Sequence, residues 1–283
     1  MGAGKAQGNL LLFIDADVAV DTQALERIAA RFEQDPDLDA LIGSYDDSPA
    51  DPGFVSQFKN LMHAFVHQSG NRQAFSFWCG CGAVKRDVYL AHGGLDESYR
   101  RASIEDIEFG LRMMKAGRKL ALDPQVRCKH LKVWTLWNMV CTDVFQRGIP
   151  WTELILRTGY LPNDLNLKNS QRVSVLLTGV LVLLGVIGIC RAATGSALMP
   201  WAAIAGGAAV CLAAIAWMNR AFYKFLVSRK GWMFTLAAFP LHIFYYLYSG
   251  ASFVMGVAAY LLRTVPPPPQ PHGLPHCQAE DKP

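Results

Sequence analysis

The sequence predicts an α/β domain followed by three transmembrane helices. Strand-like and helix-like patterns alternate through the first 165 residues, which is typical of an α/β layer architecture. Residues 165–279 then contain no Asp or Glu, and long uncharged stretches within them reach the length of a membrane-spanning helix. The expected division is therefore 1–165 for the α/β domain with its interfacial helices, 166–263 for the transmembrane region, and 264–283 for a disordered Pro-rich tail.

Apolar runs and helical spacing locate the elements of the first domain. Residues 9–14 form a continuous apolar run of the kind found in buried strands. Further strands or extended segments are expected at 40–42, 74–84 and 119–123. Helices are expected between them, at 21–32, 54–68, 85–91 and 105–116. An aromatic-rich face at helical spacing around 134–145 predicts a helix that lies at the membrane surface.

Three uncharged stretches predict membrane-spanning helices at about 173–190, 198–219 and 232–262. The third is read as one long helix that can kink at Pro240. Basic residues precede the first stretch and separate the second from the third, whereas Arg191 alone lies between the first and the second. By the positive-inside rule, the first domain then faces the cytoplasm at the cell (inner) membrane. Three spans would place the tail on the extracytoplasmic side.

The distribution of charge and cysteine excludes two broad classes of protein. The first 172 residues contain 20 basic and 21 acidic residues, so the formal net charge of +4 belongs to the apolar half. A basic, acid-free apolar half indicates a membrane partner and no nucleic acid. The seven cysteines are an odd number, which argues against a secreted disulfide scaffold.

Asp15 and Asp17 are the first candidates for chemistry, because they directly follow the apolar run at 9–14. In an extended strand, residues i and i+2 point to the same side, so the two carboxylates could hold one divalent cation, Mg²⁺ or Mn²⁺. A cation there can neutralise a diphosphate leaving group. The alternative is an ordinary solvated acidic turn at the end of a strand.

Two further candidates lie later in the domain. Glu105 and Asp106 stand where a polar loop meets a helix, so they could supply a general base or simply complement the helix dipole. Arg147 could pair with a phosphate group, and Trp151 could stack on a sugar ring. Anchoring to lipid headgroups explains Arg147 and Trp151 equally well.

Taken in order, several segments resemble those of membrane-bound glycosyltransferases of family 2, which have the GT-A fold. The segments are GAGKAQGNLLLFIDADV, FWCGCGAVKRDVY, GGLDESY, EDIEFGLRMMKAG, the lone His in CKHLKVWTL, and QRGIPW. The resemblance runs from about Gly2 to Trp151 and continues more loosely through the three spans. Six motifs in this order and spacing are far more specific than any one of them.

The resemblance implies roles for individual residues. Asp15 and Asp17 would form the DxD site that holds the divalent metal ion and the nucleotide diphosphate. His130, the lone late histidine, would approach the metal or the diphosphate, although a structural histidine packed in the core fits the position equally well. Of the pair Glu105 and Asp106, the second would be the catalytic base.

The same resemblance implies a substrate-binding set made of Gly80, Gln146, Arg147 and Trp151. This chain reads Q-R-x-x-P-W where the family carries Q-x-x-R-W, which leaves the role of Gln146 open and disfavours processive synthesis. A second departure concerns the start of the chain. Family members carry further strands and helices before the DxD strand, including the residue that reads the nucleotide base. The sequence is therefore expected to be N-terminally truncated and to hold the C-terminal part of a GT-A domain.

The function implied by the resemblance is an inverting glycosyl transfer at the cytoplasmic face of the membrane. A nucleotide-sugar donor would give its sugar to a hydroxyl group of a lipid, a lipid-linked molecule or a polysaccharide. Two alternatives stay open: the acceptor is a polyprenyl phosphate, or the chain is a non-catalytic glycosyltransferase remnant. A phosphate acceptor is already ionised and needs little help from a base, so the Glu105–Asp106 pair favours a hydroxyl acceptor. The remnant alternative follows from the expected truncation.

Overall fold

The computed structural model describes residues 2–99, 102–195 and 199–262, and its described part contains a five-stranded mixed sheet. The spatial order of the strands is β1-β4-β3-β5-β2, in which β3 and β5 are parallel and the other neighbours are antiparallel. The strands are β1 (Leu10–Ile14), β2 (Val18–Val20), β3 (Ala40–Tyr45), β4 (Cys81–Lys85) and β5 (Leu120–His130). The structure thus confirms the predicted α/β domain.

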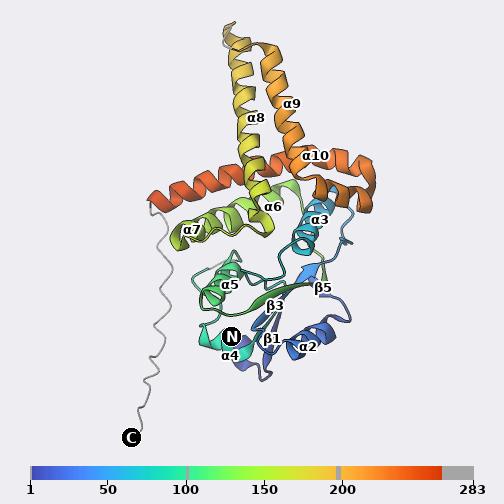
Figure 1. Ribbon diagram of the computed structural model, residues 1–283, viewed down its shortest axis with the longest axis vertical. Helices are drawn as coiled ribbons and strands as arrows, with labels where there is room; N and C mark the ends of the chain where they lie inside the picture. Colours follow the sequence, from blue (N-terminus) through green and yellow to red (C-terminus); the bar gives the residue numbers. More distant parts are fainter. Residues whose placement is uncertain (1, 100–101, 196–198, 263–283) are drawn as a thin grey trace.

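Helices cover both faces of this sheet (Figure 1). α2 packs on one face, and α4 and α5 pack on the other. Neighbouring residues of β3 point to opposite faces, so Leu41 contacts the α2 side whereas Ala40 and Ile42 contact the α5 side. The helices of the domain are α1 (Gly2–Lys5), α2 (Ala24–Gln34), α3 (Phe54–Gln68), α4 (Arg86–Ala91) and α5 (Glu105–Lys115).

Two parts of the sheet differ from the sequence-based expectation. Of the segment at 74–84, the end joins the sheet as β4, and the start meets β5, where the Ala74 N–H donates to the Leu120 carbonyl at 3.0 Å. The chain between these two places runs against α5. The approach is so close that a Cβ on Gly110 would lie 1.9 Å from the backbone nitrogen of Phe77. The strand β2 is absent from the expectation, since three residues are too few to show an alternating pattern. It forms through its pairing with β5, in which Val18 lies opposite His130.

After β5 the chain forms one continuous helical stretch. Its three parts are α6 (Leu136–Cys141), the π-helix η1 (Thr142–Gly148) and α7 (Ile149–Thr158). Pro150 has no N–H, so the carbonyl of Gln146 loses the hydrogen bond that an α-helix would give it. The Ser103 hydroxyl donates to that carbonyl instead, at 2.6 Å. The sequence predicts the helix in this region but not its π turn.

Three apolar helices follow, and all three are long and apolar enough to cross a membrane by length and composition. They are α8 (Asn169–Thr194), α9 (Trp201–Met218) and α10 (Arg220–Leu262), preceded by the 3₁₀ turn η2 (Leu165–Leu167). α8 and α9 form a hairpin that stands away from the α/β domain (Figure 1). The tail expected at 264–283 lies outside the described residues.

The long helix α10 is interrupted near its start. Gly231 has φ 81° and ψ 173°, a backbone conformation that glycine adopts at little cost. Helical geometry continues through Pro240, where the sequence suggests a kink. The break therefore lies at Gly231, where the missing side chain permits a positive φ, and α10 consists of a short first segment and a long second one.

The second segment of α10 lies very close to η1 and α7. A Cβ on Gly148 would come within 2.3 Å of the Ser252 hydroxyl oxygen. A Cβ on Gly256 would come within 2.6 Å of the Cβ of Thr152. These four small residues are spaced four apart on each helix, which lets the two backbones approach closely.

A buried ion pair joins three of these elements. The Lys59 ammonium of α3 lies 2.5 Å from the Asp143 carboxylate of η1, and the Lys59 side chain is 2% exposed. The Tyr248 hydroxyl of α10 donates to the same carboxylate at 2.7 Å. Burial lowers the pKa of Lys59 and the Asp143 charge opposes that effect. The ammonium therefore depends on Asp143 to stay charged inside the protein.

We expect Asp143→Asn to destabilise the protein strongly, because it leaves the Lys59 ammonium buried without its counter-charge. Breaking a buried pair in this way typically costs about 3–5 kcal/mol. Thermal unfolding in detergent measures the change. Asp35→Asn is the matched control, since it removes the partner of the exposed Lys119 and should have a much smaller effect. Equal losses of stability in the two variants would show that the buried pair contributes no more to stability than the exposed pair does.

Candidate active site

Asp15 and Asp17 lie in the turn that joins β1 to β2. The Val18 N–H donates to the Asp15 carbonyl at 3.0 Å, which closes the turn. The two carboxylates therefore do not share one side of an extended strand, as the i, i+2 argument assumed. The turn keeps them near each other instead: burial raises the pKa of Asp15, and the charge of Asp17 adds to this effect.

His130 lies beside Asp17 because β2 pairs with the end of β5. Its Nε2 is 3.7 Å from the Asp17 carboxylate. Its Nδ1 is 2.7 Å from the Asn60 side-chain oxygen, which also accepts from the Trp134 indole N–H at 3.0 Å. Nδ1 must therefore carry the proton, which leaves the lone pair of Nε2 directed toward Asp17. Burial lowers the pKa of His130 to about 4, so the imidazole is neutral near pH 7.

The donor set fits a divalent cation. A carboxylate oxygen of Asp17 and the lone pair of His130 face each other without a proton between them, and Asp15 lies next to Asp17. Within the described ranges, no group of three or more His, Cys, Asp or Glu side chains is already arranged to enclose a metal ion. Mg²⁺ commonly takes only one or two protein carboxylates and completes its shell with substrate phosphates and water. Asp15 and Asp17 match that pattern.

Asp106 is a half-buried carboxyl group at the start of α5. It accepts the Cys79 N–H at 3.2 Å and the Ile107 N–H at 2.7 Å. Burial raises its pKa to about 6, and the charge of Glu105 adds to this effect while the backbone N–H groups oppose it. Such a group is ionised at neutral pH yet basic enough to accept a proton.

Glu105, although adjacent, has a different environment. Its carboxylate accepts the Ser103 N–H at 2.7 Å, and so it holds the loop that precedes α5. The Ser103 hydroxyl in turn bonds to Gln146 of η1. Glu105 therefore positions the loop between Asp106 and η1.

Two cations lie near the Asp15 carboxylate. Arg147 of η1 and Lys132, which follows β5, both act on its pKa by lowering it. A guanidinium nitrogen of Arg147 also lies 3.3 Å from Nε2 of His63. The sequence motif includes Lys132 without singling it out, and only its place two residues after His130 could have drawn attention to it. Together the two cations give the site the positive charge that a diphosphate requires.

The other expected substrate-binding residues have structural contacts. The Trp151 ring packs against the cluster that contains Ile104 and Ile107, on the flank of α5. Gly80 lies under the Trp78 ring, where a Cβ would come within 2.3 Å of an indole carbon. Gln146 is exposed and contributes its backbone carbonyl to the bond with Ser103. These contacts lie around the start of α5, where Asp106 is located.

An aromatic cluster that was not predicted from the sequence packs against His130. The Tyr45 ring stacks on His130 at 4.5 Å between centroids, and the Trp78 ring meets it edge-on at 4.6 Å. His63 and His67 stack on the same tyrosine. Burial lowers the pKa of both histidines, to about 4 for His67, so they are neutral near pH 7. These residues come from separate elements, and spacing along the chain gives no sign of their contact.

Comparison with known families gives a match over the first part of the chain. Residues 2–142 match the model of the family described as glycosyltransferase like family 2. The chain belongs to this glycosyltransferase family. No curated protein matches it.

Solved structures give a more distant likeness to this family 2 chain. One is the mannosyltransferase PcManGT from Pyrobaculum calidifontis, in complex with GDP-Man and Mn²⁺, with 13% identity and a TM-score of 0.40 over 93% of this chain and 65% of that one. Another is GalNAc-T7 with UDP, GalNAc and Mn²⁺, with 14% identity and a TM-score of 0.37 over 80% and 43%. This chain thus spans less than two thirds of either protein.

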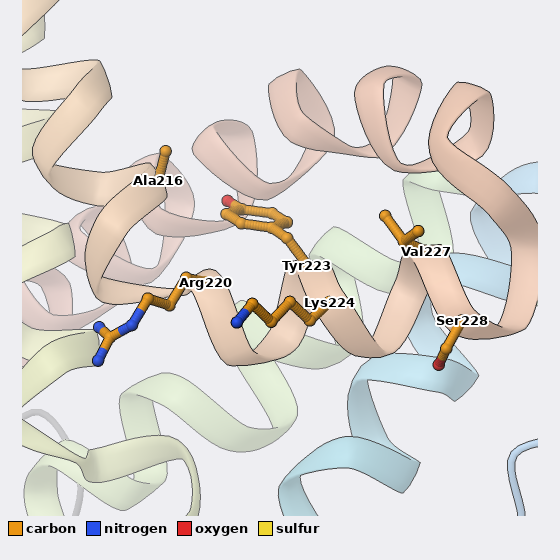
Figure 2. Close-up of a pocket in the computed structure, with 6 residues that line it drawn as sticks. All are labelled: Ala216, Arg220, Tyr223, Lys224, Val227 and Ser228. Carbon is orange, nitrogen blue, oxygen red and sulfur yellow. The ribbon is translucent and has the colours of Figure 1, made fainter.

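A separate surface groove of about 440 Å³ lies at the junction of α9 and α10 in this glycosyltransferase (Figure 2). Its lining includes Arg220, Tyr223 and Lys224, and none of its lining residues belongs to the carboxylate site. The groove is therefore not the place where the chemistry of Asp106 would occur.

We expect Asp106→Asn to stabilise the fold at pH 8. The ordinary pKa of 3.8 rises to about 6 in the folded protein, so burying the charged form costs at most about 3 kcal/mol. This penalty develops as the pH rises from about 4 to about 6 and is fully present above it. The variant should therefore unfold at a higher temperature than the unmodified protein at pH 8, with the difference shrinking toward pH 4. Asp37→Asn, at an exposed position, is the control, and a gain independent of pH would contradict the assignment.

Proposed function

We propose that this protein transfers a sugar from a nucleotide-sugar donor to a hydroxyl group of a lipid or lipid-linked acceptor at the cytoplasmic face of the membrane. The observation that carries the proposal is the Asp106 carboxyl, whose pKa of about 6 suits a general base, and on which the Arg147 cation acts as it does on Asp15. Membership of glycosyltransferase family 2 supports the same reaction class.

The donor diphosphate would occupy the space between Asp15, Asp17, Arg147 and Lys132. Asp15 and Asp17 would hold the divalent cation, Mg²⁺ or Mn²⁺, with the His130 imidazole beside them. When bound, that ion supplies positive charge to the diphosphate leaving group. Arg147 and Lys132 add hydrogen-bond donors and further positive charge at the same place. Their long side chains let them follow the diphosphate as it leaves.

Asp106 would take the proton from the acceptor hydroxyl. The acceptor oxygen then forms a bond to the anomeric carbon while the bond from that carbon to the diphosphate oxygen breaks. The proton stays on the Asp106 carboxyl, and the electron pair of the broken bond leaves with the nucleoside diphosphate. A single displacement of this kind inverts the configuration at the anomeric carbon. The Cys79 N–H holds the carboxyl in place during the step.

The surroundings of Arg147 favour an acceptor that is anchored in a membrane. Arg147 and Asp143 lie on the same short helix η1, and Tyr248 of the apolar helix α10 donates to Asp143. Arg147 is therefore about one helical turn from a residue that contacts an apolar helix, a position from which its long side chain could meet a lipid headgroup. A polyprenyl phosphate acceptor would also reach this place, but it would have no proton for Asp106 to remove.

Replacing the base should reduce turnover without removing donor binding. Loss of a positioned general base typically lowers kcat about 10²–10⁴-fold, and we expect this for Asp106→Asn. The measurement is sugar transfer from a panel of nucleotide sugars to membrane lipids, with donor affinity measured separately. Glu105→Gln is the neighbouring comparison and should have a smaller effect on kcat, since that carboxylate positions a loop. Loss of donor affinity together with turnover would make Asp106 a structural residue.

Turnover should also require a divalent cation. Asp15→Asn and Asp17→Asn should each abolish activity, and chelation should have the same effect on the unmodified protein, with recovery on adding Mg²⁺ or Mn²⁺. Direct metal titration by calorimetry, in the presence of the nucleoside diphosphate, gives a readout that does not depend on turnover. Asp37→Asn serves as the exposed control. Full activity of the purified protein in excess EDTA would remove the metal ion from the proposal.

A further inference from the structure

The second segment of α10 does not run beside α8 and α9. In Figure 1 it crosses the base of their hairpin, on the side of the α/β domain, at a steep angle to both helices. The glycine break at Gly231 precedes this crossing and turns the chain back across the base. A third spanning helix would be expected to lie roughly along the hairpin.

Contacts at the middle of α10 place it at one end of the hairpin. The Tyr246 hydroxyl bonds to the Gln171 side-chain oxygen at 2.9 Å and to the Asn219 side-chain oxygen at 2.8 Å. Gln171 lies at the start of α8 and Asn219 directly follows α9, so both mark the end that is next to the α/β domain. A Cβ on Gly250 would lie 3.0 Å from Val175, which is also near the start of α8.

Contacts toward both ends of the segment are with residues 2–158, which carry the candidate active site and are called the catalytic half below. The Phe234 ring meets Phe54 of α3 with 5.1 Å between centroids. Gly256 meets Thr152 of α7, as described above. Gly256 follows Phe234 by 22 positions, a separation of about 33 Å along an α-helix, which is about the thickness of the hydrocarbon core. A helix that crossed the membrane could not keep both contacts on one side.

The composition agrees with a position at the membrane surface. The mean hydropathy is 1.2 for α10, against 2.7 for α8 and 1.8 for α9. Its first segment, before Gly231, carries the cations Arg220, Lys224, Arg229 and Lys230. Figure 2 shows Arg220 and Lys224 directed to the same side of this segment. The Arg220 guanidinium lies 4.6 Å from the centre of the exposed Trp217 ring, a pairing suited to the headgroup region.

We propose that α10 lies flat at the membrane surface on the side of the catalytic half, and that α8 and α9 alone cross the membrane. The phospholipid leaflet that surrounds the adjoining end of the hairpin would contact the exposed apolar side chains of α10. These are Trp232, Met233, Leu236, Phe253, Val254, Leu261 and Leu262. The end of α10 at Leu262 is then on the same side as Asp106. This reverses the side that the positive-inside argument with three spans gives to the tail.

A depth measurement on the full chain tests this arrangement. Spin labels are attached to Leu236→Cys and Val254→Cys on α10, and to Leu183→Cys in the middle of α8 as the deep control. Each signal is taken relative to the chain with its native cysteines alone. The chain is reconstituted in vesicles of zwitterionic and anionic phospholipid, and quenching by oxygen and by a water-soluble nickel complex gives the depth. Leu236 and Val254 should be equally shallow and Leu183 deep.

Labels at 236 and 254 that differ in depth by most of a leaflet, with one of them deep, would overturn the proposal. A second measurement does not depend on the labelled variants folding well. A fluorescent protein fused after Pro283 should fluoresce, whereas alkaline phosphatase at the same position should be inactive, because the first works in the cytoplasm and the second outside it. The opposite pair of results would restore a three-span topology. Neither experiment requires sugar transfer, so failure here leaves the proposed function untouched.

Discussion

The position of the catalytic half against the apolar helices depends on the buried ion pair between Lys59 and Asp143. An isolated charge in this position would be very costly, so neither side chain can move away without the other. Lys59 is fixed in α3, Asp143 is fixed in η1, and the Tyr248 hydroxyl adds α10 to the same carboxylate. One network therefore allows these three helices a single relative arrangement.

The short helix η1 connects this ion pair to the candidate active site. One end is held by Asp143, and the other is held by the Ser103 hydroxyl on the Gln146 carbonyl. Arg147 lies directly after that carbonyl, and Asp106 lies three residues after Ser103. Arg147 and Asp106 thus lie close along the chain to the two ends of the same hydrogen bond. Pro150 makes this possible by leaving the carbonyl free, which gives a structural meaning to the departure from the family motif.

Local patterns in the sequence predicted many of the strands and helices of this protein, but such patterns carry no information about contacts between distant segments. A continuous apolar run fixes β1, and the carboxylates after it and at the start of α5 follow from position along the chain alone. The order of apolar stretches likewise predicts three long helices. What the sequence could not supply is contact between distant segments: β2 depends on pairing with β5, and Lys132 approaches Asp15 through that pairing. The sequence suggested that Trp151 could stack on a sugar. In the structure Trp151 packs beside Ile104, because α7 packs against α5.

The direction of α10 is a second feature that local sequence patterns do not predict. Hydropathy records how apolar a helix is, but not whether it crosses a membrane or lies along it. Tyr246 and Tyr248 each require a polar partner, and the partners available to them are Asn219, Gln171 and Asp143 at the base of the hairpin. Satisfying these hydroxyl groups holds the helix across the base. Polar side chains, rather than apolar content, thus determine its orientation.

Burial determines which groups around the carboxylates are charged. Burial keeps His63, His67 and His130 neutral near pH 7, so in the described part of the chain the charges acting on Asp15 come from Asp17, Glu105, Arg147 and Lys132. A nucleoside diphosphate and a divalent cation carry opposite charges, and together they change the local field much less than either does alone. In the proposed function, a bound cation alone would lower the pKa of Asp106, and a bound diphosphate alone would raise it. The two together would shift this pKa less than either one does, so the basicity of Asp106 would change least when both are bound.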